Sequence, residues 1–419
     1  MHCRIDGIGH DGQGVARIQG LAVFVPGALP GEEVEIQMVE KKRNWARARL
    51  VKLLDPSPSR VAPPCPYYTR CGGCSYQHAN YALQLTLKKQ VVSETLRRIG
   101  RVDTEVHDVM GMDTPWRYRN KATWHGSQRR GELQMGYFQQ SSHTLLPVED
   151  CLLISESMQA VSLFAFAQLR LLKRKEKLEL TVRESSFDKR LMLLLSGVSR
   201  REAQYVKDDL QDQADSVYWV DHEKEVLLAG NLVLEERLDN QAFRISPRAF
   251  FQVNHQQASK LIKIVHDFLD LQGGESILDA YCGIGSLALG FAKKARRVVG
   301  IEAFPGAVED ARNNAAINGL DNCRFLCGLC EEILPGLEEK FDAVILDPPR
   351  SGCRPEVIHA VARMNPSKLV YVSCEPSTLA RDLSHFKEAG YHAVQVQPID
   401  MFPQTRHIET VVRLERKHN

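Results

Sequence analysis

The stretch SILDAYCGIGSLAL, residues 276–289, decides the fold. It opens with an apolar segment of the length and content of a buried strand. Gly283 and Gly285 then allow the backbone to approach a ligand closely, and the helix expected next offers its N-terminal amides. This order of strand, glycine loop and helix is typical of the ligand-binding edge of a parallel sheet.

The surrounding sequence repeats the same pattern. Continuous apolar strands separated by helical segments predict a mostly parallel, Rossmann-like α/β sheet with both faces covered. We assign residues 246–419 to this domain. The segments that carry the pattern are a helix at 253–271 and strands RRVVGIE (296–302), CRFLC (323–327), FDAVILD (341–347) and LVYVSC (369–374).

The first half of the chain has a different organisation. Short strands between glycine turns, at 21–25, 33–39 and 45–53, predict a small OB-like β-barrel over residues 1–56. The proline-rich segment DPSPSRVAPPCP (55–66) marks a boundary. Residues 57–245 then form a mixed α+β central domain. It begins with a helix at 80–99 that has apolar residues at helical spacing, and the runs LELTVRES and RLMLLLSGV predict antiparallel strands.

Composition restricts the class of protein. A length of 419 residues predicts two or three domains. The chain has no run of about 18 apolar residues and no signal-like start. We therefore expect a cytoplasmic monomer without a membrane partner. In that compartment the 11 cysteines are expected to be thiols or metal ligands rather than disulfides.

Charge is unevenly distributed although the net charge is only +2. Residues 41–130 contain 18 Lys or Arg against 6 Asp or Glu. A basic surface interleaved with aromatic rings is typical of a nucleic-acid-binding face, whereas the alternative is a solvated basic surface without a partner. The interleaved rings are Trp45, Tyr67, Tyr68, Tyr76, Trp116, Tyr118 and Trp124.

Acidic residues end two of the expected parallel strands. Glu302, 19 residues after Gly283, has the position of a group that accepts hydrogen bonds from ribose hydroxyls. Asp347 ends the strand before the stiff turn LDPPRSGC (346–353). The loop G-I-G-S-L-A by itself does not exclude a dinucleotide as the ligand. The turn LDPPRSGC, in combination with D-x-x-C-G-x-G and the acidic strand end at Glu302, indicates S-adenosylmethionine.

Three cysteines lie close together in the loop CPYYTRCGGC (65–74). Cys65, Cys71 and Cys74 in such a Gly- and Pro-rich loop are expected to be metal ligands, and Cys151 is the candidate for the fourth. Their spacing alone allows either zinc or an iron–sulfur cluster. A second set of cysteines lacks a glycine-rich ligand loop, and we interpret its members as core thiols: Cys323, Cys327, Cys330 and Cys353.

Five motifs together resemble the class I, S-adenosylmethionine-dependent RNA uracil-C5 methyltransferases, and the resemblance covers nearly the whole chain. It implies that Gln252, Tyr281, Glu302 and Asp347 contact the cofactor. The positions of Tyr281 and Glu302 alone favour the same role. The motifs are FFQVN (250–254), DAYCGIG (279–285), LDPPRSG (346–352), VSCEPSTLARD (372–382) and MFPQTRHIE (401–409).

The chemistry of this family requires two further groups. Uracil C5 becomes nucleophilic only after a thiolate adds to C6, and a base must later remove the C5 proton. The resemblance makes Cys374, at a strand end, the nucleophile and Glu409 the base. Two residues depart from the family pattern. Glu375 stands where Asn is usual, and a carboxylate facing the thiol would raise its pKa; Leu329 stands where a polar residue often faces the adenine.

The resemblance extends to the other domains. It makes the barrel a TRAM-like RNA-binding module, and it makes Cys65, Cys71, Cys74 and Cys151 the ligands of a [4Fe–4S] cluster. Family members with both modules typically act on 23S rRNA, so we expect that substrate, with tRNA as the alternative. A non-catalytic iron–sulfur RNA-binding protein is the alternative from another class, and the presence of both Cys374 and Glu409 argues against it.

Overall fold

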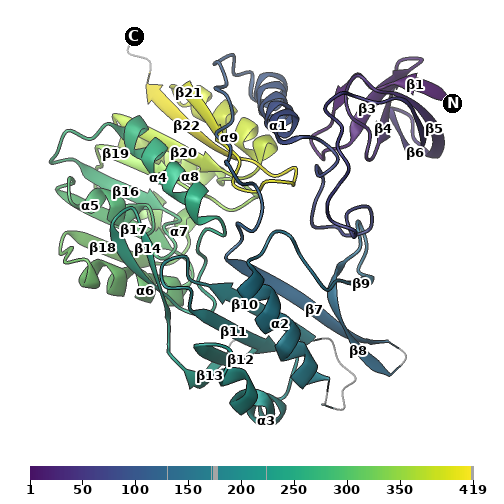
Figure 1. Ribbon diagram of the computed structural model, residues 1–419. Coiled ribbons are helices and arrows are strands. Elements are labelled where there is room, and N and C mark those ends of the chain that lie inside the picture. Colours follow the sequence, from purple (N-terminus) through teal and green to yellow (C-terminus); the bar gives the residue numbers. More distant parts are fainter. Residues whose placement is uncertain (130, 171, 173–177, 223, 417–419) are drawn as a thin grey trace.

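Three large β-sheets organise the chain, in the order of the sequence (Figure 1). The computed structural model describes residues 1–129, 131–170, 172, 178–222 and 224–416. Within these residues no helix is both long and apolar enough to cross a bilayer.

The first sheet is a six-stranded barrel-like unit with the strand order β1-β5-β6-β4-β3-β2. Side chains alternate along β6, so that Ala46 and Ala48 are buried while Arg47 and Arg49 are exposed. Strand β6 therefore presents the side chains of Arg47 and Arg49 to solvent. The strands are β1 (His2–Arg4), β2 (Gly7–Ile8), β3 (Gly14–Ile18), β4 (Leu21–Val25), β5 (Glu33–Lys41) and β6 (Trp45–Asp55).

Helix α1 (Tyr81–Thr95) lies between the barrel and the C-terminal part of the chain (Figure 1). The Asn80 side chain caps it by accepting a hydrogen bond from the Leu83 amide, and one π-helical turn, Leu96–Gly100, extends it. This confirms the helix predicted at 80–99. The helix and its π-turn contact α9 (Pro376–Glu388), so they pack on the C-terminal sheet rather than on the central one.

The central sheet has the order β13-β12-β11-β10-β7-β8-β9. β10 pairs antiparallel with β11, as predicted, whereas β11 and β12 are parallel because helix α3 connects them. Residues of α2 and α3 share one apolar core with the strands beneath them. The elements are β7 (Lys121–Arg129), β8 (Glu132–Phe138), β9 (Leu145–Pro147), α2 (Glu156–Leu169), β10 (Leu178–Glu184), β11 (Leu191–Ser196), α3 (Arg200–Gln211), β12 (Ser216–Asp221) and β13 (Lys224–Gly230).

The C-terminal sheet has the order β18-β17-β16-β19-β20-β22-β21. Its first five strands in this order are parallel, and β22 and β21 are antiparallel to their neighbours. Two apolar clusters, one on each face, confirm the predicted covering by helices. The elements are α4 (His255–Leu269), β16 (Ser276–Ala280), α5 (Ala288–Ala292), β17 (Arg297–Glu302), α6 (Pro305–Ile317), β18 (Cys323–Cys327), α7 (Cys330–Gly336), β19 (Ala343–Leu346), α8 (Pro355–Met364), β20 (Lys368–Ser373), α9, β21 (Tyr391–Ile399) and β22 (Glu409–Arg416).

Packing crosses the predicted domain boundary at 245, and the boundaries at 56 and 245 both stay predictions. The hairpin of β14 (Leu234–Leu238) and β15 (Gln241–Ile245) contributes Leu238, Phe243 and Ile245 to the core beside α4 and α6. Like α1, this hairpin precedes the α/β segment in sequence and packs with it in space.

Candidate active site

The pairing of β20 with β22 brings Cys374 and Glu409 together. Ser373, the last residue of β20, pairs with Thr410 of the antiparallel strand β22. The next position along β20 is Cys374, and the preceding position along β22 is Glu409, so the register places the two residues opposite each other. Cys374 is half-buried, and Glu409 is only 4% exposed.

Asp347 lies on the other side of Cys374. β19 pairs in parallel with β20 up to Leu346, which is opposite Tyr371, so Asp347 emerges at the same edge of the sheet. Burial, followed by repulsion from Asp347, raises the pKa of Glu409 well above its ordinary value, while Arg350 opposes that rise. Desolvation also raises the pKa of Asp347. A carboxyl group with a raised pKa is suited to proton transfer near neutral pH.

The thiol of Cys374 has a high pKa in the free protein. Burial is the largest cause, Glu409 and Asp347 add to it, and the result is a pKa of about 11. The positive charge of Arg350 acts in the opposite direction. Arg350 follows the two prolines of the LDPPRSG turn, and its charge next to both reacting groups was not recognised as part of the site from the sequence.

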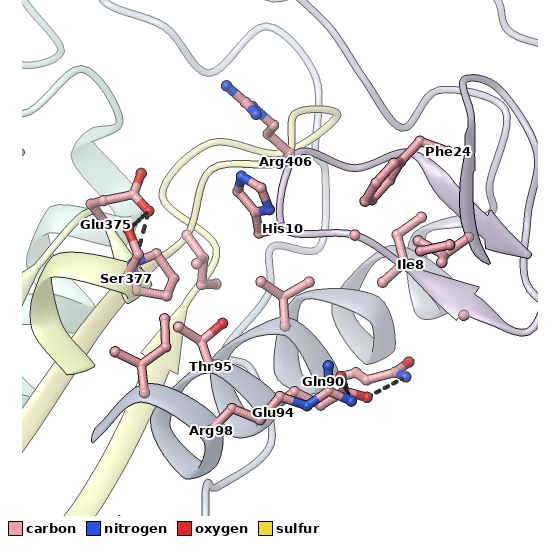
Figure 2. Close-up of a pocket in the computed structure, with 18 of the residues that line it drawn as sticks. Ile8, His10, Phe24, Gln90, Glu94, Thr95, Arg98, Glu375, Ser377 and Arg406 are labelled. Carbon is pink, nitrogen blue, oxygen red and sulfur yellow. Dashed lines mark hydrogen bonds and ion pairs between the residues drawn. The ribbon is translucent and has the colours of Figure 1, made fainter. Parts of the chain in front are cut away.

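Glu375 points away from the thiol. Its carboxylate accepts hydrogen bonds from the Ser377 amide (3.4 Å) and the Ser377 hydroxyl (2.8 Å), and it thereby caps α9 (Figure 2). Pro376 occupies the first turn of that helix, where a missing N–H is harmless. Glu375 is accordingly not among the groups that raise the pKa of Cys374. The conflict expected for a carboxylate in this position does not arise.

The glycine loop after β16 has a left-handed backbone at both of its glycines. Gly283 and Gly285 have φ angles of 55° and 84°, in the region that favours glycine. Glu302, at the end of β17, accepts hydrogen bonds from the amides of Gly283 (3.1 Å) and Phe304 (2.7 Å). This acidic strand end therefore lies directly against the loop.

Tyr281 begins that loop with an unusual backbone. Its φ angle is 67°, a value that side-chain-bearing residues rarely adopt. Its hydroxyl interacts with the Cys353 thiol, and burial together with the nearby Cys353 and Cys330 raises its pKa. The hydroxyl of Tyr281 therefore contacts the LDPPRSGC turn through Cys353, the last residue of that turn. Gln252 is half-buried and its carbonyl accepts a hydrogen bond from Asn120 Nδ2 (3.1 Å).

Asp279 is an acidic residue of this edge that the predicted site residues omit. It is fully buried in β16, and within the described residues neither carboxylate oxygen has a hydrogen-bond partner of ordinary geometry. Burial, followed by repulsion from Asp347, raises its pKa well above the ordinary value. Three acidic residues next to one glycine loop fit a cationic ligand, and S-adenosylmethionine carries both a sulfonium and an ammonium group. In the sequence, Asp279 is the first residue of the DAYCGIG motif, and this was the signal that could have identified it.

A groove of about 740 Å³ reaches Cys374 from the direction of the barrel (Figure 2). Three parts of the chain line it. Barrel residues such as His10, Arg17 and Phe24 form one wall, one side of α1 and its π-turn forms another, and residues 374–377 and 406–408 close the end. His407 in the last segment is held neutral, because burial and the charges of Arg350 and Arg406 lower its pKa to about 4.

The four predicted ligand cysteines line one cavity of about 390 Å³. Cys65, Cys71 and Cys151 contribute, after burial, to raising the pKa of Cys74 to about 12, so the four thiols lie within electrostatic reach of one another. The donor chemistry therefore fits a thiolate-bound metal centre. Over the described ranges, however, no group of three or more His, Cys, Asp or Glu side chains has a metal-binding arrangement as it stands.

The second set of cysteines corrects part of the interpretation from sequence. Cys330 and Cys353 are buried, as expected for core thiols. Cys323 is half-buried and Cys327 is exposed, because β18 is an edge strand of the sheet and has a neighbouring strand on one side only. Cys282 is buried within the glycine loop.

Comparison with known proteins shows the family of the chain. The family described as tRNA (Uracil-5-)-methyltransferase matches residues 80–417, and the TRAM domain matches residues 3–51. An uncharacterised RNA methyltransferase of Clostridium tetani is 35% identical over 441 residues, covering 97% of this chain and 94% of the relative. One from Listeria innocua is 37% identical over 444 residues, covering 99% and 97%.

A solved structure is similar over its full length. The tRNA (uracil-54, C5)-methyltransferase of Pyrococcus abyssi, in complex with S-adenosyl-L-homocysteine, is 27% identical with a TM-score of 0.76, covering 99% of this chain and 100% of that one. Family match, sequence identity and shared architecture agree with one another. The chain belongs to the S-adenosylmethionine-dependent RNA uracil-5 methyltransferases, and it carries a TRAM domain at its N-terminus.

Proposed function

We propose that this protein methylates C5 of a uridine in RNA through a covalent bond between Cys374 and uracil C6. The observation that carries the proposal is the β20–β22 register, which sets Cys374 opposite Glu409 with Asp347 and Arg350 beside them. When bound, S-adenosylmethionine supplies an electrophilic methyl group. The Cys374 thiolate adds to C6 and makes C5 nucleophilic enough to take that methyl group.

Glu409 completes the reaction in this proposal. Its carboxylate accepts the proton from C5, the bond between C6 and sulfur breaks, and the thiolate of Cys374 is restored. Burial of Glu409 makes the carboxylate a stronger base than an exposed one. Arg350 favours the thiolate over the thiol, and so counteracts the two carboxyl groups around Cys374.

The cofactor would lie along the carboxyl ends of β16, β17 and β19. In this proposal Glu302 would accept hydrogen bonds from the ribose hydroxyls, and Asp347 would contact the cofactor next to the nucleophile. Gln252 and Tyr281 are further contacts, Tyr281 through its ring or backbone because its hydroxyl is engaged with Cys353. We add Asp279 as a group whose buried negative charge favours the cationic cofactor.

The trapping experiment uses RNA containing 5-fluorouridine, whose C5 fluorine cannot be removed as a proton. With S-adenosylmethionine, the wild-type protein should form an adduct that survives denaturing electrophoresis. Cys374→Ser should form none, and an adduct in that variant would refute the nucleophile assignment. Glu409→Gln should instead accumulate a methylated adduct on ordinary RNA, and a folded variant without this adduct would require another base.

The RNA substrate is proposed to be 23S rRNA, with tRNA as the second candidate. The resemblance of the barrel and cysteine-loop architecture to the rRNA enzymes supports the first. The Pyrococcus abyssi tRNA enzyme supports the second, because it covers 99% of this chain and so has a comparable overall architecture. Mapping 5-methyluridine in rRNA and tRNA from cells with and without the gene decides between them, because the modification should disappear from one RNA class only.

We further propose that Cys65, Cys71, Cys74 and Cys151 hold a [4Fe–4S] cluster with a structural role. Support comes from the four thiols that line one cavity. Arg119 lines the same cavity and its charge would balance an anionic cluster. Anaerobic purification should yield a brown protein with iron and sulfide, and one zinc without iron would contradict the proposal.

A further inference from the structure

The loop before Glu409 is short and connects two paired strands. Ile399, the last residue of β21, pairs with Glu409, the first residue of β22. Residues 400–408 form the connection, and residues 406–408 line the groove that leads to Cys374. The position of the Glu409 carboxyl therefore depends on how this loop, hereafter the 400–408 loop, is held.

Helix α1 holds the loop through a buried ion pair. The side chains of Lys88 and Asp400 are both fully buried, and the Lys88 ammonium pairs with one Asp400 oxygen. Lys88 also donates to the carbonyl of Phe402 (3.1 Å). The hydroxyl of Tyr81 donates to the other Asp400 oxygen (2.8 Å) and accepts from the Met112 amide (2.9 Å). Each charged group thus has a specific partner.

Two glutamines reinforce this attachment. Gln84, one turn before Lys88, exchanges hydrogen bonds with Gln404 in the middle of the loop: its amide donates to Oε1 (2.9 Å) and its oxygen accepts from the Gln404 N–H (3.1 Å). From α4, Gln257 Nε2 donates to the carbonyl of Asp400 (2.9 Å). The loop is therefore fixed at its start and at its centre.

A buried ion pair is weak evidence for stability, because removing two charges from water offsets much of their attraction. Its best supported use is to fix one arrangement among several. The same helix and its π-turn also present Gln90, Glu94, Thr95 and Arg98 to the groove (Figure 2). One rigid element thus joins the groove to the loop that precedes the proposed base.

We propose that Lys88 and Asp400 are positioning residues for Glu409: they fix the 400–408 loop so that the Glu409 carboxylate faces C5 of the uracil bound to Cys374. This inference rests on the proposed function. It predicts a defect confined to the last step, because methyl transfer to C5 precedes removal of the C5 proton by Glu409. Loss of the ion pair should leave methyl transfer faster than proton removal.

The test compares three variants on RNA labelled with tritium at uridine C5, isolated from cells that lack the gene. Lys88→Met removes one charge, and Lys88→Met/Asp400→Asn removes both so that no unpaired buried charge is left to prevent folding. Lys89→Met is the matched control, because Lys89 pairs with the exposed Asp108 on the outside of the same helix. Rates are referred to the fraction of protein that binds S-adenosylmethionine.

In the wild type and in Lys89→Met, methyl incorporation and tritium release should be equal. In both Lys88 variants tritium release should lag, an adduct resistant to denaturation should accumulate on ordinary RNA, and kcat should fall by about a hundredfold, the effect of misplacing a reacting group by about 1 Å. The KM for RNA should change little.

Equal methyl incorporation and tritium release in a folded Lys88 variant, with no adduct, would overturn the positioning role and leave the proposed function intact. Absence of cofactor-dependent tritium release from the wild type would overturn both.

Discussion

The pKa of the Cys374 thiol depends on three charged neighbours, and each can be removed separately. Glu409→Gln removes the largest cause of the raised pKa after burial, and Arg350→Gln removes the positive charge that opposes the rise. The two variants should shift the thiol titration in opposite directions. Glu375→Gln is the matched control, because Glu375 is next to Cys374 in sequence but its carboxylate caps α9.

The magnitude follows from the wild-type value. A thiol pKa of about 11, against an ordinary 9.0, means that about one Cys374 side chain in a thousand is ionised at pH 8. Two pKa units correspond to about 2.7 kcal/mol against the thiolate. Burial remains in every variant, so Glu409→Gln should lower the pKa but leave it above 9.0. The gain in thiolate at fixed pH is then less than about a hundredfold.

The assay is the rate of alkylation by iodoacetamide between pH 8 and 10. Only the thiolate reacts, so the logarithm of the rate rises linearly with pH below the pKa, and a parallel displacement of the line measures the pKa change. Trypsin releases residues 369–381 as a peptide with Cys374 as its single cysteine, so mass spectrometry separates this thiol from the other ten.

Glu409→Gln should displace the line toward faster alkylation while abolishing turnover, and Arg350→Gln should displace it toward slower alkylation. Glu375→Gln should leave it in place. Displacement by Glu375→Gln as large as that by Glu409→Gln would refute the account of this site, as would displacement of the first two variants in the same direction.

Three other predictions concern the cofactor edge and the groove. Gly300→Ala should destabilise the protein by about 1–3 kcal/mol in denaturant unfolding, because an added Cβ would lie 2.6 Å from Phe325 and 2.7 Å from Cys282. Asp279→Asn should weaken S-adenosylmethionine binding in calorimetry. It should also raise the melting temperature, and by more at pH 8 than at pH 4, because a carboxyl group whose pKa is raised by folding costs stability as pH rises and the group ionises. An equal effect at both pH values would contradict the burial of an ionised Asp279 carboxylate. Arg17→Ala should weaken the salt dependence of RNA binding. The slope of the logarithm of affinity against the logarithm of salt concentration should decrease by about 1, as expected for the loss of one phosphate contact.

Local sequence determined the strand ends and the glycine loop. Apolar runs flanked by helical segments predict parallel strands, and a ligand at their carboxyl edge follows from that arrangement. Glu302, Asp347 and Cys374 could therefore be assigned to one edge, because each is the residue at or just after a strand end. The resemblance of the five motifs then added the reaction, which strand periodicity does not contain.

Only the tertiary structure decided how groups from distant segments meet. The antiparallel register of β22 sets Glu409 opposite Cys374, and no local sequence pattern encodes which strand β22 pairs with. The direction of Glu375 depends on a capping bond to Ser377, although its place in the sequence suggested a conflict with the thiol. Lys88 and Asp400 are 312 residues apart in the sequence. Neither their contact nor the complete burial of both charges can be predicted from the sequence, and the burial is what makes the pair a specific constraint on the loop.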